Sequence, residues 1–180
     1  SPEWLLAIST RTLFCPQHKR PDRCSNRSKV QLTLRSDYAL RVLVYLSTHP
    51  DRIVTTQEIS SAYGISKHHL VRVIQTLAEH QHVKIHPGRS GGVKLAREPH
   101  KIRLGDVVQA AEPNLRLVEC FDKRTNTCPI SSVCALKGIL NEGLIAFVNT
   151  LNRYTIADVI QSSNQRKLAN IFATVTWQTR

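Results

Sequence analysis

The chain has 180 residues, of which 41% are hydrophobic and 21% charged, and its longest apolar run, GLIAFV at 143–148, is too short to cross a bilayer. The net charge of +12 favours a polyanionic partner, either nucleic acid or an anionic membrane face. Five cysteines without an export signal predict a cytoplasmic protein with reduced thiols rather than a disulfide scaffold.

Residues 1–30 have little periodicity, and we expect them to form a flexible N-terminal extension. Cys15, His18 and Cys24 could bind zinc, but they supply three ligands at a spacing that matches no standard site. Incidental cysteines are the better interpretation. The chain has no methionine, and initiation at Val30, where the domain pattern begins, is an alternative start.

A first helix is predicted from Ser36, which is a candidate N-cap. Its apolar residues recur at helical spacing: Ala39, Val42, Leu43 and Leu46. The sequence His-Pro-Asp at 49–51 predicts the turn that ends this helix.

A helix-turn-helix is predicted over residues 55–80, TTQEISSAYGISKHHLVRVIQTLAEH. Thr55 or Thr56 opens its first helix, Gly64 breaks that helix, and Ser66 is a fresh N-cap for the second. The second helix offers polar groups to bases or phosphates in a major groove, from Ser66, Lys67, His68, His69, Arg72 and Gln75. An ordinary helical hairpin with a charged face explains this stretch equally well when it is taken alone.

A two-stranded hairpin is predicted over residues 83–96, VKIHPGRSGGVKLA. After a helix and a helix-turn-helix, this hairpin completes the order of a winged helix. Its tip offers Arg89 and Lys94 to a phosphate backbone or minor groove. A nucleotide-binding loop is disfavoured, because the Walker lysine and a following helix are both missing.

The C-terminal half is predicted to hold a short helix at 104–112, a cysteine loop at 113–135 and a long helix from about Ser132 to Asn152. An apolar stripe of the long helix suits a partner helix from a second subunit, although internal packing also explains it: Leu136, Ile139, Leu140, Leu144, Phe147, Val148 and Leu151. A short helix at 154–160 and a weakly structured tail at 162–180 follow.

The predicted fold class is therefore mainly α with a small β-wing. It comprises a winged helix-turn-helix domain at 31–112, the cysteine loop at 113–135, dimerisation helices at 136–162 and a tail at 163–180.

The cysteine loop contains ECFDKRTNTCPISSVC, residues 119–134, and holds three of the five cysteines. Structural zinc prefers Cys-x-x-Cys pairs and four ligands, which this stretch lacks. A thiol switch is compatible with three cysteines in one loop. An iron–sulfur cluster fits the wide gaps best, provided that a fourth ligand comes from elsewhere. No paired-acid, HExxH or nucleophile motif occurs, so we do not expect an enzyme.

Several stretches together resemble one family: QLTLRSDYALRVLVYL, ISKHHLVRVIQTLAEHQHVKIHPGRSGGVKLA, IRLGDVVQAAEP, the three loop cysteines and NRYTIADVI. They are similar to the winged-helix iron–sulfur regulators, which include the NsrR-type nitric-oxide-sensing repressors and the IscR-type regulators. The likeness covers about residues 31–162 and is greater to the NsrR type. It implies a homodimeric repressor that carries one 2Fe–2S or 4Fe–4S cluster per subunit, binds a palindromic operator, and releases that DNA when nitric oxide nitrosylates the cluster.

The resemblance assigns Cys120, Cys128 and Cys134 to the cluster and Asp37 of the partner subunit to the fourth position. Asp37 could equally be an acid favourable at a helix N-terminus. IscR-type proteins have a histidine three residues after the last cysteine, where this chain has Lys137.

Two departures from the family concern the cysteine loop and the wing. The first cysteine gap is longer than usual in the family. Pro87 stands where many relatives have arginine, so we expect Arg89 to make more of the contact between the wing and the DNA groove.

Two other functions remain open. One is a winged-helix regulator that uses the same cysteines as a thiol redox or iron–sulfur status switch. The other is a zinc-containing, non-specific nucleic-acid-binding protein.

Overall fold

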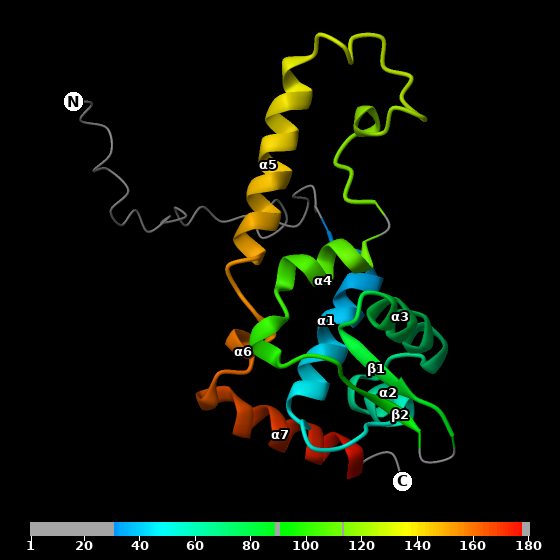
Figure 1. The fold of residues 1–180 in the computed structure, drawn as a ribbon, viewed down its shortest axis with the longest axis vertical. Coiled ribbons are helices and arrows are strands. Elements are labelled where there is room, and N and C mark those ends of the chain that lie inside the picture. Colours follow the sequence, from blue (N-terminus) through cyan, green and yellow to red (C-terminus); the bar gives the residue numbers. More distant parts are fainter. Residues whose placement is uncertain (1–30, 89–90, 113, 178–180) are drawn as a thin grey trace, which may run out of the picture. The chain divides into compact units, whose positions relative to one another are not determined.

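The computed structural model describes residues 31–88, 91–112 and 114–177, and it confirms a mainly helical fold with one small sheet (Figure 1). The helices are α1 (Leu34–Ser47), α2 (Thr56–Tyr63), α3 (Lys67–Glu79), α4 (Leu104–Ala111), α5 (Ala135–Leu151), α6 (Ile156–Val159) and α7 (Ser162–Trp177); the strands are β1 (Val83–His86) and β2 (Gly92–Leu95). Two short 3₁₀ turns lie at Pro99–Lys101 and Glu119–Phe121. The expected flexible extension at 1–30 and the Arg89 wing contact lie outside the described residues.

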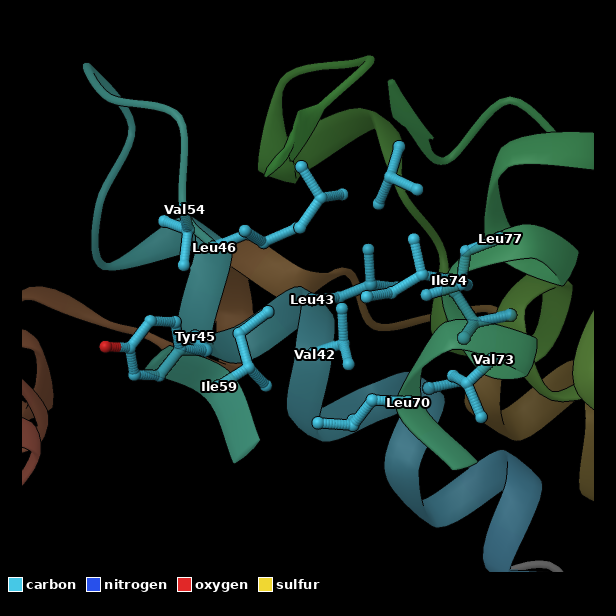
Figure 2. Close-up of a cluster of buried hydrophobic side chains, with 14 of the residues drawn as sticks. Val42, Leu43, Tyr45, Leu46, Val54, Ile59, Leu70, Val73, Ile74 and Leu77 are labelled. Atoms are coloured by element: carbon cyan, nitrogen blue, oxygen red, sulfur yellow. The ribbon is translucent and has the colours of Figure 1, made fainter. Parts of the chain in front are cut away.

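The core lies between α1, α2 and α3, whose apolar stripes face one another (Figure 2). Val42 and Leu43 of α1 are buried beside the stripe of α3, and Leu46 is buried beside Val54. The stripe of α3 consists of Leu70, Val73, Ile74 and Leu77. Helical spacing puts each set on one face, as the sequence predicts. Because both stripes are buried, the opposite face of α3 is fixed toward solvent.

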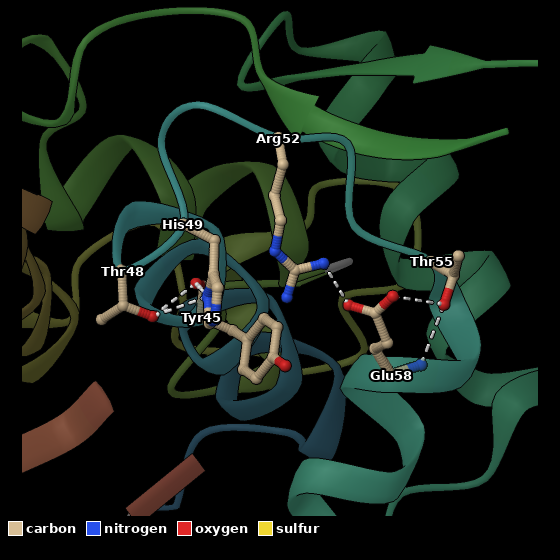
Figure 3. Close-up of polar contacts among 6 residues, drawn as sticks. All are labelled: Tyr45, Thr48, His49, Arg52, Thr55 and Glu58. Atoms are coloured by element: carbon tan, nitrogen blue, oxygen red, sulfur yellow. Dashed lines mark hydrogen bonds and ion pairs between the residues drawn. The ribbon is translucent and has the colours of Figure 1, made fainter. Parts of the chain in front are cut away.

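The helix-turn-helix is confirmed, and local polar contacts fix both the start of α2 and the turn that follows it. The Thr55 hydroxyl accepts a hydrogen bond from the Glu58 N–H at 3.2 Å, and Arg52 pairs with the Glu58 carboxylate at 2.6 Å (Figure 3). Gly64 ends α2 in the left-handed region with φ +64°, which glycine adopts without steric cost. At the turn itself, the Ser60 hydroxyl donates to the Ile65 carbonyl oxygen at 2.7 Å, which ties the last turn of α2 to the segment before α3.

The predicted N-cap at Ser36 is wrong, because α1 begins two residues earlier, at Leu34. Thr33 holds the extended conformation of a cap, and its carbonyl accepts the Asp37 N–H at 3.2 Å. The Arg35 guanidinium donates to the Thr76 hydroxyl of α3, which holds this first turn in the helix. Ser36 is consequently buried inside α1, and its hydroxyl has no hydrogen-bond partner among the described residues.

The predicted hairpin is present as an antiparallel pair with Val83 opposite Leu95 and Ile85 opposite Val93. Val83 and Val93 are buried, whereas Ile85 is exposed. Val93 also pairs with Val54, so the segment before α2 runs along β2. This pairing anchors β2 on the segment that leads into the helix-turn-helix.

The long predicted helix is α5, which begins at Ala135 rather than Ser132 because the chain turns between Ile130 and Val133. Its C-terminal end packs on α4, where Val148 is buried and a Cβ at Gly105 would approach the Val148 carbonyl oxygen to 2.9 Å. Glycine therefore allows α4 and α5 to approach closely.

The weakly structured tail predicted for 162–180 is wrong over Ser162–Trp177, which forms α7. This helix packs on α2, and Phe172 is buried with its ring 4.8 Å from that of Tyr45 and 5.3 Å from that of Tyr63. Apolar contact with the aromatic side chains of α1 and α2 stabilises a helix whose first six residues, SSNQRK, are all polar.

Candidate DNA-binding surface and cysteine loop

The exposed face of α3 carries the polar residues expected to read DNA: Lys67, His68, His69, Arg72 and Gln75, with Ser66 exposed at its N-cap. Ser66 takes the predicted cap position, although its side chain makes no capping hydrogen bond. A helix of this kind presents its N-terminal residues to base edges in a major groove. The structure brings these residues to one surface.

The orientation of this face is fixed by α1. The Arg35–Thr76 hydrogen bond joins the first turn of α1 to the middle of α3, and the Tyr38 ring lies 6.4 Å from that of His69. A hollow of about 370 Å³ separates the two helices and is lined on one side by Arg35 and on the other by Arg72. A shift of α1 would therefore move this exposed face of α3.

The wing adds a second cationic group. Lys94, which the sequence singled out, lies directly opposite Lys84 across the hairpin. Like charges at opposed strand positions repel, and an anionic partner relieves that repulsion. Lys84 was missed in the sequence, although the hairpin register predicts its place beside Lys94.

The cysteine loop runs between α4 and α5, and Cys120, Cys128 and Cys134 are all free thiols with partial exposure. One hydrogen bond orders the chain around the middle cysteine, because the Cys128 N–H donates to the Asn126 side chain at 3.1 Å. Asn126 in turn donates to the Ser131 hydroxyl at 2.7 Å. Side chains of the loop itself thus fix the backbone at Cys128.

Ion pairs close the N-terminal part of this loop. Asp122 accepts a charged hydrogen bond from Arg116 at 2.5 Å and the Arg124 N–H at 3.0 Å. The Arg124 N–H and the Arg116 charge hold the pKa of Asp122 below its ordinary value. The Arg116 side chain is 37% exposed and that of Arg124 is 85% exposed, and both pair with the one Asp122 carboxylate.

Asp37 lies in the first turn of α1 and pairs with Arg41 at 2.7 Å. The Arg41 guanidinium in turn sits over the rings of Tyr38 and Tyr63, at 5.9 and 5.8 Å from their centroids. The carboxylate is about 40% exposed. It is accessible to a second molecule but has a competing partner within its own chain.

The chemistry of these side chains fits an iron–sulfur cluster, since three unpaired thiols on one loop and an accessible carboxylate are suitable iron ligands. Within the described part of the single chain, no three His, Cys, Asp or Glu side chains are gathered closely enough to hold a metal ion. The donors are thus present, but a single chain does not assemble them.

A helix-turn-helix with a basic exposed second helix, followed by a two-stranded wing, defines the winged-helix class of DNA-binding proteins. The profile of the Rrf2 family, described as "Iron-dependent Transcriptional regulator", matches residues 32–162. The chain belongs to this family. It is accordingly a transcriptional regulator and not an enzyme.

Relatives of known name extend this result. The chain is 40% identical over 137 residues to the HTH-type transcriptional regulator NsrR of Halalkalibacterium halodurans. The aligned region covers 76% of this chain and 94% of the relative. It is also 40% identical over 134 residues to the regulator of the same name from Bacillus subtilis. That aligned region covers 74% of this chain and 92% of the relative. The resemblance to NsrR-type regulators is confirmed.

The solved structure of T. potens IscR is similar in fold, with a TM-score of 0.59 and 22% identity over 74% of this chain and 88% of that one. At that identity the likeness shows the fold alone. None of the helices in the described residues is long and apolar enough to span a membrane.

Proposed function

We propose that the protein is a cytoplasmic, homodimeric repressor that binds a palindromic operator while it carries an iron–sulfur cluster and releases the DNA in response to nitric oxide. The observation that carries this proposal is the placement of three free thiols on one loop of a winged-helix regulator. The 40% identity to NsrR proteins over nearly their whole length supports the same conclusion.

Cys120, Cys128 and Cys134 would hold the cluster as thiolates, with Asp37 of the partner subunit as the fourth ligand. When bound, the cluster supplies iron to which nitric oxide can bind. Arg116 and Arg124 both pair with Asp122 and close the loop segment that follows Cys120. For Asp37 to act as a ligand, its carboxylate must leave the ion pair with Arg41.

The exposed apolar face of α5 is the surface that we assign to the dimer. Leu136 is 58% exposed, Ile139 64% and Phe147 43%, although all three are large apolar residues on one side of α5. An apolar strip of this kind is unfavourable in water and suits the same helix of a second subunit. A dimer would also bring each cysteine loop near a second chain.

The route from the loop to DNA runs through α1. Asp37 and Arg35 lie on the same first turn, and Arg35 is hydrogen-bonded to Thr76 of α3. Release of Asp37 would therefore alter the restraint on the groove-reading helix. Because two half-sites require a spacing of about 34 Å, a small change in the setting of α3 lowers affinity for the operator.

A thiol switch is the second candidate, and the free state of all three cysteines favours it. Two of these thiols could form a disulfide under oxidation without any iron. A zinc-containing, non-specific nucleic-acid-binding protein is a weaker third, because the loop lacks a Cys-x-x-Cys pair.

The test is to purify the protein without oxygen, measure iron and sulfide, and select its binding sites from random DNA. Cys128→Ala should abolish tight binding to the selected palindrome while leaving a folded dimer. Val133→Ala changes an 84% exposed residue of the same loop and should bind like the wild type. Unaltered operator affinity in Cys128→Ala would contradict cluster-dependent binding.

A further inference from the structure

One contact spans the whole of the longer gap between cysteines. A single oxygen of the Glu119 carboxylate accepts the Thr127 N–H at 2.5 Å and the Thr127 hydroxyl at 2.6 Å. The hydroxyl and the N–H of Thr127 hold the pKa of Glu119 below its ordinary value. We name this pair of hydrogen bonds the Glu119–Thr127 clamp.

The clamp joins the immediate neighbours of two cysteines. Glu119 comes directly before Cys120, and Thr127 comes directly before Cys128. The hydrogen bonds between Glu119 and Thr127 therefore bring together the two backbone positions that precede these cysteines. Glu119 also lies in the 3₁₀ turn that contains Cys120, and Asn126 fixes the backbone at Cys128. Both ends of the clamp are therefore ordered rather than freely moving.

We propose that Glu119 and Thr127 are positioning residues that hold Cys120 and Cys128 together as a pair. The effect of this clamp on cluster binding rests on the function proposed above. The pairing of the two thiols is independent of that function. The clamp brings the ends of the long first gap together before iron arrives. It therefore removes part of the entropy cost of closing this segment on a metal group.

Chain length alone predicts the opposite pairing. Cys128 and Cys134 have five residues between them, against seven between Cys120 and Cys128. Loop closure by a flexible chain would favour the shorter segment by about 1.5-fold. A preference for the Cys120–Cys128 pair thus requires an added restraint, and the clamp provides one.

The first experiment uses the reduced, iron-free full chain, with limiting diamide as oxidant. Two thiols lose two electrons and two protons to diamide, which becomes the hydrazine, and one S–S bond forms. Peptide mass spectrometry then maps the disulfides. The wild type should yield Cys120–Cys128 at least threefold faster than Cys128–Cys134. Glu119→Gln and Thr127→Val should lose this preference, whereas Thr127→Ser keeps the hydroxyl and should retain it.

A matched control separates the clamp from a general effect of charge. Glu142→Gln makes the same chemical change at an exposed position on α5 and should react like the wild type. If Glu119→Gln gives the wild-type disulfide ratio, or if the wild type favours Cys128–Cys134, the clamp proposal is overturned.

The second experiment concerns the cluster. After anaerobic reconstitution with ferrous iron and sulfide, iron release to a ferrous chelator should be three- to tenfold faster in Glu119→Gln than in the wild type and in Glu142→Gln. Equal release rates in all three proteins would overturn the positioning role at the cluster. Failure of the wild type to assemble any cluster would instead reject the proposed function. The disulfide ratio would then still show whether the clamp pairs Cys120 with Cys128.

Discussion

Phe172→Ala tests the contact between the last helix and the helix-turn-helix. Phe172 is 5% exposed and its ring contacts Tyr45 of α1 and Tyr63 of α2. Deletion of a buried Phe side chain to Ala in a closed core costs about 3–5 kcal/mol. The transfer of such a side chain from water contributes about 1.5–3 kcal/mol.

The lower of these ranges applies, because α7 is the last described helix and can detach while the rest stays folded. We therefore expect Phe172→Ala to lower the free energy of unfolding by about 2–3 kcal/mol, close to the transfer term alone. Urea unfolding of the cluster-free protein, followed by circular dichroism, measures this loss. Trypsin should also cleave faster after the exposed Arg166 and Lys167 of the detached helix.

Ile171→Ala is the matched control, since Ile171 is adjacent but 54% exposed. This change should cost less than about 0.5 kcal/mol. If both variants unfold at the same urea concentration and resist trypsin equally, then the packing of α7 on the helix-turn-helix described above is incorrect.

Three further predictions concern backbone geometry and pH. Gly105→Ala should lower the unfolding free energy by up to about 2 kcal/mol in urea titrations, because a helix-propensity gain near 1 kcal/mol offsets only part of an overpacking cost of about 1–3 kcal/mol; a stabilised variant would refute the close approach of α4 to α5. Gly64→Ala should cost about 1 kcal/mol in the same assay, since alanine is strained at φ +64°; an unchanged midpoint would argue against that turn. Burial lowers the pKa of His82 below its ordinary 6.5, so the unfolded state takes up a proton first as pH falls. Stability should therefore decline from pH 6.5 downward and level off below the folded-state pKa, and His82→Gln should weaken this decline, as thermal unfolding at several pH values would reveal.

The helix-turn-helix and the wing could be predicted because local residues determine them. Thr55, Gly64 and the apolar spacing of α3 each act within a few positions of the chain. The hairpin follows from alternation around a glycine-rich turn. Such signals do not depend on contacts between distant segments.

The errors arise where distant segments meet. The sequence of α7 begins with the polar run SSNQRK, and Leu168 and Phe172 lie four positions apart, at the spacing of one helical face. Its stability comes from aromatic rings more than a hundred positions earlier in the chain. The start of α1 similarly depends on a hydrogen bond from Arg35 to Thr76, which the sequence of α1 alone could not indicate.

The candidate site was predicted in its residue types but not in its assembly. The three thiols and Asp37 are where the sequence places them, on a loop and on a first helical turn. The Glu119–Thr127 clamp was missed, because a contact between loop residues eight positions apart has no regular spacing. The role proposed for Asp37 involves a second subunit, so contacts within one chain do not indicate it.

Simultaneous recording of cluster absorption and DNA binding tests the central claim most directly. The anaerobically loaded protein is bound to a fluorescent palindrome from the site selection, and nitric oxide is then added in steps. The account predicts that anisotropy falls in proportion to the loss of cluster absorption. DNA that stays bound after the cluster absorption has disappeared would contradict it.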